Sequence, residues 1–422
     1  MKVYKFGGAS VRNADGVRNL LKIIGDERDL FVIVSAMGKT TNALERVFAG
    51  VQQADRQAVA AEIAALRDCH ATIIEELWHG PVRLERVEAF FAELEEVTSR
   101  SDYNPEDAEL WYDRIVAFGE LISTTIISEY LAYAGVPNRW VDMRRALVTE
   151  QRHKDAEVDL AASAPRLRAE VEGRSERIFV GQGFIGGAPD GTTTTLGREG
   201  SDYSAAVAAH ILDAESMAVW KDVDGVLNAD PKIFPDAVQI AELNYLDTIE
   251  LAYSGAQIIH PRTIKPLQNK NIPLYVRPFG DKRKPGTVIR GVSAPVEVPI
   301  LILKKDQVLL TIRSRDFSFV LEEKFAAIFS LLERYRIKAN LVHNSAVNLS
   351  LCVDDSWHID QAVDALRKEG FDVLKIGRME LLTVRGYTDG LWQRYACGPQ
   401  VFIRQATQST VRIVRKAEAN RN

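Results

Sequence analysis

The feature that most constrains this chain is a long loop rich in glycine and threonine at residues 181–206. An apolar, β-prone segment at 177–180 comes before the loop, and Ser201 stands at the N-cap position of the apolar helix that follows. This order of strand, polar loop and helix start leaves free backbone N–H groups and the positive end of a helix dipole beside the loop. The sequence therefore predicts a binding site for an anion, such as a phosphate or a carboxylate.

Three glycines of this loop, Gly181, Gly183 and Gly186, also spell G-x-G-x-x-G, the fingerprint of a dinucleotide-binding fold. That fingerprint requires a helix to begin at the third glycine. Here the turn-forming sequence Gly-Ala-Pro-Asp-Gly follows instead, which argues against a dinucleotide. A solvated loop without a function is the other alternative, but it does not explain why Arg198 and Asp202 lie beside a helix start.

Composition limits the classes of protein to consider. The 422 residues suggest about two to four domains, and 46% hydrophobic with 26% charged residues is typical of a globular protein. A net charge of -5 argues against nucleic-acid binding. Cys69, Cys352 and Cys397 show no metal-binding or disulfide spacing, and the sequence has no signal-peptide pattern or membrane-spanning run. We expect a cytoplasmic protein without a nucleic-acid or membrane partner.

Alternating strands and helices predict an α/β fold for the first part of the chain. The strands at 3–6 and 30–34 each lead into a short glycine-containing loop and then a helix, which indicates a parallel sheet covered by helices. The segment 42–96 is typical of a helical insertion. Polar segments also follow later strands, at 181–206 and 221–232, so the carboxyl ends of several strands are expected to meet at one ligand-binding crevice.

A second region begins where the composition changes, near residues 281–295. The strands and helices expected beyond it follow the order βαββαβ of a ferredoxin-like α+β unit. A further strand at 379–385 begins another unit that is not completed. The predicted division of the chain is therefore 1–295, 300–388 and 389–422.

Six motifs occur in order along the chain: KFGGAS from Lys5, SAMGKTTN from Ser35, Gly119-Glu120, TTLGREGSDYSAA from Thr194, WKDVDG from Trp220 and SGAQIIHPRTI from Ser254. Together they resemble aspartate kinase, of the amino-acid kinase superfamily, over roughly residues 1–290, and the rest resembles an ACT region more weakly. The resemblance implies a three-layer α/β/α sandwich around an eight-stranded, mostly parallel sheet. By this resemblance, residues 1–295 form an amino-acid kinase catalytic domain, residues 300–388 an ACT-like regulatory domain and residues 389–422 a truncated second ACT remnant.

The activity that the resemblance implies is ATP-dependent phosphorylation of the β-carboxylate of L-aspartate, the first step towards lysine, threonine and methionine. A carboxylate with a pKa near ~3.9 is already an anion at neutral pH, so the reaction needs charge neutralisation and alignment instead of a general base. Lys5 is the predicted cation over the transferring phosphoryl group. Gly7 and Gly8 let the backbone approach the phosphates.

The resemblance also assigns the other site residues. Arg198 matches the position that binds the α-carboxylate of aspartate, and Glu120 matches the position that binds its α-ammonium group. Asp202 matches the residue that orients the catalytic lysine, with helix capping as its alternative role. The further expected contacts are Thr41 and Ser201 for the substrate, and Lys221, Asp222, Lys232 and Gln257 for the nucleotide. Mg²⁺ is expected with ATP but without a dedicated protein cage, and the missing G-x-x-x-x-G-K-[ST] motif excludes a P-loop kinase.

Several positions depart from the pattern of the family. Ala9 stands where threonine is usual, Leu227 where tyrosine is frequent and Gln257 where many members have lysine, so nucleotide affinity is expected to be altered but not lost. Glu199 stands where glycine is usual. Its carboxylate would compete with aspartate if it pointed into the pocket, whereas catalysis survives if it points outward.

The ACT-like region departs further. The segment 313–319 lacks the glycine of the usual effector loop, and Asn340 and Ala346 match the acidic residues that meet the amines of lysine in sensitive members. We therefore predict that lysine does not inhibit this chain appreciably, and that the region serves homodimerisation.

Two other functions stay open from the sequence. One is a superfamily kinase for glutamate, acetylglutamate or UMP, although such relatives generally lack the helical insertion and an ACT region. The other is an inactive relative that binds amino acids through residues 300–422. The retained Lys5, Glu120, Arg198 and Asp202 oppose this second alternative.

Overall fold

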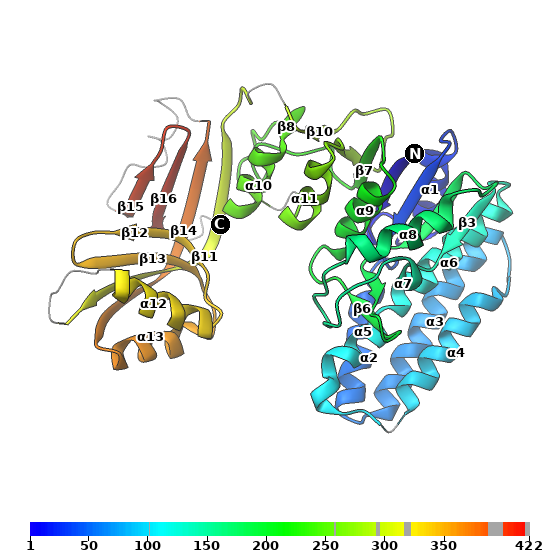
Figure 1. The fold of residues 1–422 in the computed structure, drawn as a ribbon, viewed down its shortest axis with the longest axis horizontal. Helices are drawn as coiled ribbons and strands as arrows, with labels where there is room; N and C mark the ends of the chain where they lie inside the picture. The colour runs from blue at the N-terminus through cyan, green and yellow to red at the C-terminus, as the bar shows by residue number, and fades with distance from the viewer. Residues whose placement is uncertain (101, 257–258, 293–295, 316–321, 387–399, 418–422) are drawn as a thin grey trace. The chain divides into compact units, whose positions relative to one another are not determined.

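The structure is a computed structural model that describes the chain except residues 101, 257–258, 293–295, 316–321, 387–399 and 418–422 (Figure 1). The chain forms two compact units. The first comprises Met1–Val226, Ala241–Ile249 and Ile258–Ala294, and the second comprises Leu227–Ile240, Glu250–Gln257 and Pro295–Asn422. The second unit thus includes two short segments from within the range expected for the catalytic domain.

The first unit is built on an eight-stranded sheet of order β3-β4-β2-β1-β7-β9-β10-β8, in which only the β9 and β10 pair is antiparallel. Every residue of β2 and β4 is buried, because helices cover parallel strands on both faces. The strands are β1 (Lys2–Phe6), β2 (Leu30–Val34), β3 (Asn138–Val141), β4 (Ile178–Gln182), β7 (Ser216–Lys221), β8 (Glu242–Asn244), β9 (Leu274–Pro278) and β10 (Thr287–Arg290).

Helices and one small hairpin surround this sheet. The helices are α1 (Ala14–Ile24), α2 (Thr40–Gln52), α3 (Arg56–Trp78), α4 (Glu85–Ser99), η1 (Pro105–Asp107), α5 (Ala108–Val116), α6 (Phe118–Tyr133), α7 (Met143–Ala146), α8 (Leu160–Val171), α9 (Gly200–Ile211), α10 (Tyr245–Ser254) and α11 (Pro261–Asn269). The hairpin pairs β5 (Ile185–Gly187) with β6 (Thr193–Thr195). The helices α2, α3 and α4 form the helical insertion that the sequence predicts.

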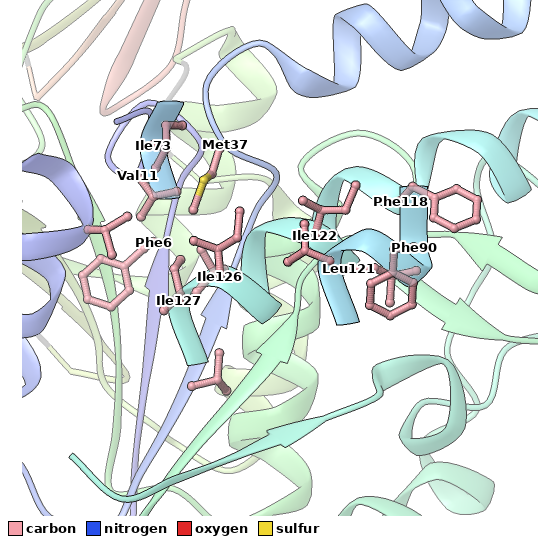
Figure 2. Close-up of a cluster of buried hydrophobic side chains, with 14 of the residues drawn as sticks. Phe6, Val11, Met37, Ile73, Phe90, Phe118, Leu121, Ile122, Ile126 and Ile127 are labelled. Carbon is pink, nitrogen blue, oxygen red and sulfur yellow. The ribbon is translucent and has the colours of Figure 1, made fainter. Parts of the chain in front are cut away.

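The main hydrophobic core joins the sheet to these helices. Phe6 of β1, Met37 and the nearly fully buried α6 contribute to one cluster, part of which Figure 2 shows. The stretch Pro105–Tyr133 is long and apolar enough to span a membrane by length and composition alone, but 83% of its most apolar window is buried. That burial is typical of a core helix.

The second unit contains a six-stranded antiparallel sheet of order β12-β13-β11-β14-β16-β15. The first six elements follow the predicted βαββαβ order: β11 (Ile300–Ser314), α12 (Glu322–Arg334), β12 (Ala339–Asn344), β13 (Asn348–Asp354), α13 (Ile359–Lys368) and β14 (Phe371–Arg385). The strands β15 (Val401–Ala406) and β16 (Thr410–Lys416) were not predicted.

Two long strands explain why the sequence suggested an incomplete second unit. The strands β11 and β14 pair with each other along nearly their whole length, but β13 pairs only with the 307–313 part of β11 and β16 only with the 379–385 part of β14. One part of each long strand therefore belongs to the βαββαβ unit, and the other part pairs outside it. The segment 379–385, predicted as the first strand of a second unit, is the second part of β14. The boundary at residue 388 stays a prediction, since 387–399 lies outside the described residues.

Candidate active site

A cavity of about 370 Å³ lies at the carboxyl edge of the parallel sheet in the first unit. Its lining residues are Lys5, Ser35, Thr41, Glu120, Phe184, Gly197, Glu199, Gly200, Ser201, Asp202 and Lys221. The parallel register pairs Lys5 of β1 with Ile33 of β2 and with Val219 of β7, so the residues that end these strands meet at one edge. Residues in the first turns of α2, α6 and α9 also line the cavity, and the positive ends of the α2 and α9 dipoles favour anions there.

A buried ion pair forms the wall of this cavity. Lys5 Nζ lies 2.7 Å from Asp202 Oδ1, and Lys221 Nζ lies 3.8 Å from Asp202 Oδ2. Lys5 is 9% exposed and Asp202 is 3% exposed. Burial acts to raise the pKa of Asp202, but the Lys5 and Lys221 ammonium groups outweigh it, so the pKa lies below its usual value. Two cations thus share one buried anion, which leaves a net positive group for a ligand.

Glu120 is the second buried acid of the cavity. Its Oε1 accepts a hydrogen bond of 3.1 Å from the Ala36 amide, whereas its Oε2 has no partner among the described residues. Burial raises the pKa of Glu120 to about 8, and the Ala36 amide and the Lys5 charge lower it only in part. A cationic group in the cavity would complete the hydrogen bonding of Glu120 and favour its ionised form.

Glycines allow the close approaches on which the cavity depends. A side chain at Gly8 would lie 2.4 Å from the Ala36 carbonyl oxygen, and one at Gly183 would lie 2.6 Å from Ser201 Oγ. Gly183 therefore lets the end of β4 touch the start of α9. Gly186 lies in β5, not at a helix start, which agrees with the rejection of the dinucleotide fingerprint.

The start of α9 differs from the prediction. Glu199, not Ser201, is the N-cap residue, and Ser201 lies within the first turn. Glu199 has a left-handed backbone with φ 54°, and its Oε2 accepts a hydrogen bond of 2.9 Å from the His260 amide. The side chain of Glu199 lines the cavity while its carboxylate is held by the protein itself. The prediction of the N-cap was wrong because the helix begins after a residue with a left-handed backbone. Glycine is the residue typical of that conformation, but the residue here is Glu199.

The structure brings together six predicted residues, Lys5, Thr41, Glu120, Ser201, Asp202 and Lys221. Arg198, Gly7, Gly8 and Asp222 belong to adjoining segments without lining the cavity, and Arg198 and Asp222 are exposed. Lys232 lies in the second unit, and Gln257 lies outside the described residues.

Sequence reasoning missed some residues of the site. Ser35 and Phe184 follow β2 and β4, so the rule that ligands bind at the carboxyl ends of strands could have found them. Asp113 does not line the cavity, but it is a buried acid that no sequence pattern had marked. It is fully buried in α5, and its carboxylate accepts hydrogen bonds from Thr195 and from His153, which are far away in the sequence.

Comparison with known proteins shows the family of the chain. A model of the amino acid kinase family matches residues 1–278. The lysine-sensitive aspartokinase 3 of Escherichia coli K12 is 32% identical over 357 residues, which are 83% of this chain and 78% of that protein. The aspartokinase of Chlamydia trachomatis serovar D is 33% identical over 334 residues, 78% of this chain and 74% of that protein.

Solved structures agree as well. The crystal structure of E. coli aspartokinase III in complex with aspartate and ADP matches with a TM-score of 0.82 and 26% identity, over 99% of this chain and 96% of that chain. The α/β sandwich and the antiparallel C-terminal sheet, which the sequence predicted, are thus confirmed. The chain belongs to the amino acid kinase family and is an aspartate kinase.

Proposed function

We propose that this aspartate kinase transfers the terminal phosphoryl group of ATP to the β-carboxylate of L-aspartate in the cavity at the carboxyl edge of the first sheet. The observation that carries the proposal is the buried contact of 2.7 Å between Lys5 Nζ and Asp202 Oδ1 at this cavity. Two anions must meet in line, and fixed positive groups lower the free energy of that approach. Lys5 is the cation proposed to stabilise the charge of the transferring group.

Asp202 is proposed to hold Lys5 in place. Its carboxylate also contacts Lys221, so both ammonium groups are aligned by one anion on the first turn of α9. Lys221 is the second cation proposed to contact the nucleotide phosphates beside Lys5. Gly7, Gly8 and Asp222 are the other proposed nucleotide contacts in the first unit. The assignment of Lys232 and Gln257 stays a prediction from the resemblance.

Mg²⁺ fits this chain as an ion carried by the nucleotide. Among the residues that the structure describes, no group of three or more His, Cys, Asp or Glu could hold a metal, and both Asp202 oxygens face lysines. Phosphate oxygens and water would supply most of its ligands, with Asp222 as an exposed carboxylate beside the cavity residue Lys221. When bound, Mg²⁺ supplies neutralisation of the triphosphate charge.

The substrate contacts are proposed as follows. The Oε2 atom of Glu120 would accept a hydrogen bond from the α-ammonium group of aspartate. Thr41 and Ser201 would donate hydrogen bonds to the carboxylates of the substrate. Arg198, which is exposed between the cavity residues Gly197 and Glu199, is proposed to bind the α-carboxylate through its guanidinium.

We also propose that lysine does not regulate this chain, although one relative is named as lysine-sensitive. Asn340 is buried, and its amide nitrogen donates to Gln307 and to Asp354 at 2.8 Å each. Its oxygen accepts a hydrogen bond of 2.8 Å from Lys304 Nζ. The ammonium group of an effector would have to displace that of Lys304, which opposes binding there.

The ACT-like region is proposed to form a homodimer. Its sheet ends in the edge strands β12 and β15, and Leu374 and Phe402 are 60% and 46% exposed. In the described part of the chain no further strand pairs with these two edges, and such edges with exposed apolar side chains favour pairing with a second copy. A cytoplasmic location and a place at the head of lysine, threonine and methionine synthesis complete the proposal.

Trapping of the acyl phosphate tests the activity. The protein is incubated with ATP, Mg²⁺ and hydroxylamine, and L-aspartate, L-glutamate or N-acetyl-L-glutamate is added as the acceptor in separate reactions. With UMP as the acceptor, ADP release is measured instead. Aspartyl hydroxamate as the main product supports the proposal. A preference for another acceptor supports a different superfamily kinase, and no acceptor-dependent product supports an inactive amino-acid-binding relative.

A further inference from the structure

The guanidinium of Arg262, at the start of α11, contacts three segments of the first unit. Its Nη1 donates to Asp155 Oδ1 at 2.6 Å and to the Leu196 carbonyl oxygen at 3.0 Å. Its Nη2 donates to the Ala156 carbonyl oxygen at 3.1 Å. The guanidinium carbon also lies 4.8 Å from the centre of the Tyr203 ring. One planar side chain therefore holds two carbonyls, one carboxylate and one aromatic ring.

These contacts enclose the part of the chain that lines the cavity. Leu196 directly precedes Gly197, and Tyr203 directly follows Asp202, so Arg262 touches both ends of the lining stretch 197–202. The middle of the stretch is held by the same segment of chain, because the His260 amide donates to Glu199 Oε2 at 2.9 Å.

The backbone of the stretch is unusual at two positions. Gly197 and Glu199 both have left-handed backbones, with φ 72° and 54°. Glycine adopts this conformation without strain, whereas at Glu199 the surrounding contacts have to stabilise it. A side chain at Gly197 would lie 2.5 Å from Asp155 Oδ1, the carboxylate oxygen that Arg262 binds. The position of the turn and the position of Arg262 are thereby coupled.

We propose that the segment His260–Arg262 is a brace that sets the turn 197–202 against the aspartate side of the cavity, and that Arg262 is a positioning residue for phosphoryl transfer. The inference rests on the proposed function of the cavity. Arg262 does not line the cavity and so acts through the turn. The Glu199 carboxylate serves as the central anchor of the brace, which keeps it bound to the protein instead of competing with the substrate.

The brace predicts a distinctive kinetic pattern. The variant R262M retains an unbranched apolar stem and removes the guanidinium donors, so kcat/KM for aspartate should fall about 100-fold while KM for ATP changes less than about two-fold. The variant R262K should recover little, because one ammonium group cannot span two carbonyls and a carboxylate. The matched control is R290M, which removes a bidentate contact with Glu242 in the same unit but away from the cavity, and it should keep wild-type kinetics.

A second variant keeps the inference testable if R262M fails to fold. In E199G the glycine suits the left-handed backbone, so the melting temperature should be retained, while loss of the His260 anchor should raise KM for aspartate about 10-fold. In the double variant R262M/E199G, the loss of transition-state stabilisation calculated from kcat/KM for aspartate should be smaller than the sum of the losses in the two single variants, since both residues act on one turn. The brace is refuted if R262M and E199G both keep kcat/KM for aspartate within about two-fold of wild type. If K5M also keeps wild-type turnover, the proposed cavity itself is wrong, whereas loss in K5M alone refutes only the brace.

Discussion

Lys5 Nζ, near the end of β1, lies 2.7 Å from Asp202 Oδ1 in the first turn of α9, and both residues are almost fully buried. A buried carboxylate that faces two ammonium groups fixes their positions, and the three groups together carry one net positive charge. Each prediction about the chemistry of this site follows from that arrangement or from the neutral acid Glu120 beside it.

Replacement of Lys5 by methionine should lower turnover by about 100- to 1,000-fold, because a preorganised charge is lost where negative charge develops. Release of ADP in the presence of aspartate measures this effect. The control is K2M, which removes an ion pair with Glu27 on the same strand, and it should keep normal turnover. Similar rates in K5M and K2M would contradict the role of Lys5.

The variant D202N should reduce the free energy of unfolding by about 3 kcal/mol, since it leaves the Lys5 charge buried without its partner. Urea unfolding at neutral pH measures the change. The double variant K5M/D202N should be more stable than D202N alone, because the uncompensated charge is then removed. If D202N is as stable as wild type, the contact does not contribute to folding.

Glu120 should make the fold less stable as the pH rises. Its pKa is about 8 in the folded chain and near ~4.3 in the unfolded chain, so the folded state binds more protons between these values. The free energy of unfolding should therefore fall from about pH 4.5 to about pH 8, by at most ~1.4 kcal/mol per pH unit from this residue. Comparison with E120Q isolates the effect, since the variant should lack this part of the slope.

Binding of aspartate should release a proton from Glu120. At pH 7 this carboxyl is mostly protonated, and the ammonium group of the substrate favours its ionised form. Calorimetric titrations in buffers of different ionisation enthalpy should give close to one proton released per aspartate. E120Q serves as the control, and an equal release from both proteins would place the titrating group elsewhere.

Lysine should leave the activity nearly unchanged at millimolar concentration, because Lys304 already occupies the hydrogen-bond acceptor of Asn340. A dose–response curve at subsaturating aspartate measures this directly. Strong inhibition at or below about one millimolar would show that the ACT-like region retains an effector site.

The sequence alone was sufficient for the parts that local patterns determine. Apolar runs such as 30–34, followed by glycine loops and helix starts, predicted the parallel sheet and its ligand-binding edge. The same reasoning predicted the βαββαβ order of the second unit. In these elements, residues close in sequence carry both the propensity and the turn chemistry, so tertiary contacts did not need to be known.

Tertiary structure decided the properties that depend on distant residues. The pKa of Glu120 follows from burial, which depends on the packing of α6, and the bracing of the turn by Arg262 joins segments far apart in the chain. The strand β16 pairs with β14 and the edge strand β15 pairs with β16, so both depend on the length of β14, which the sequence did not show. A local pattern records which surfaces a segment can bury, but the neighbours that set charge, pKa and register become defined only when the chain has folded.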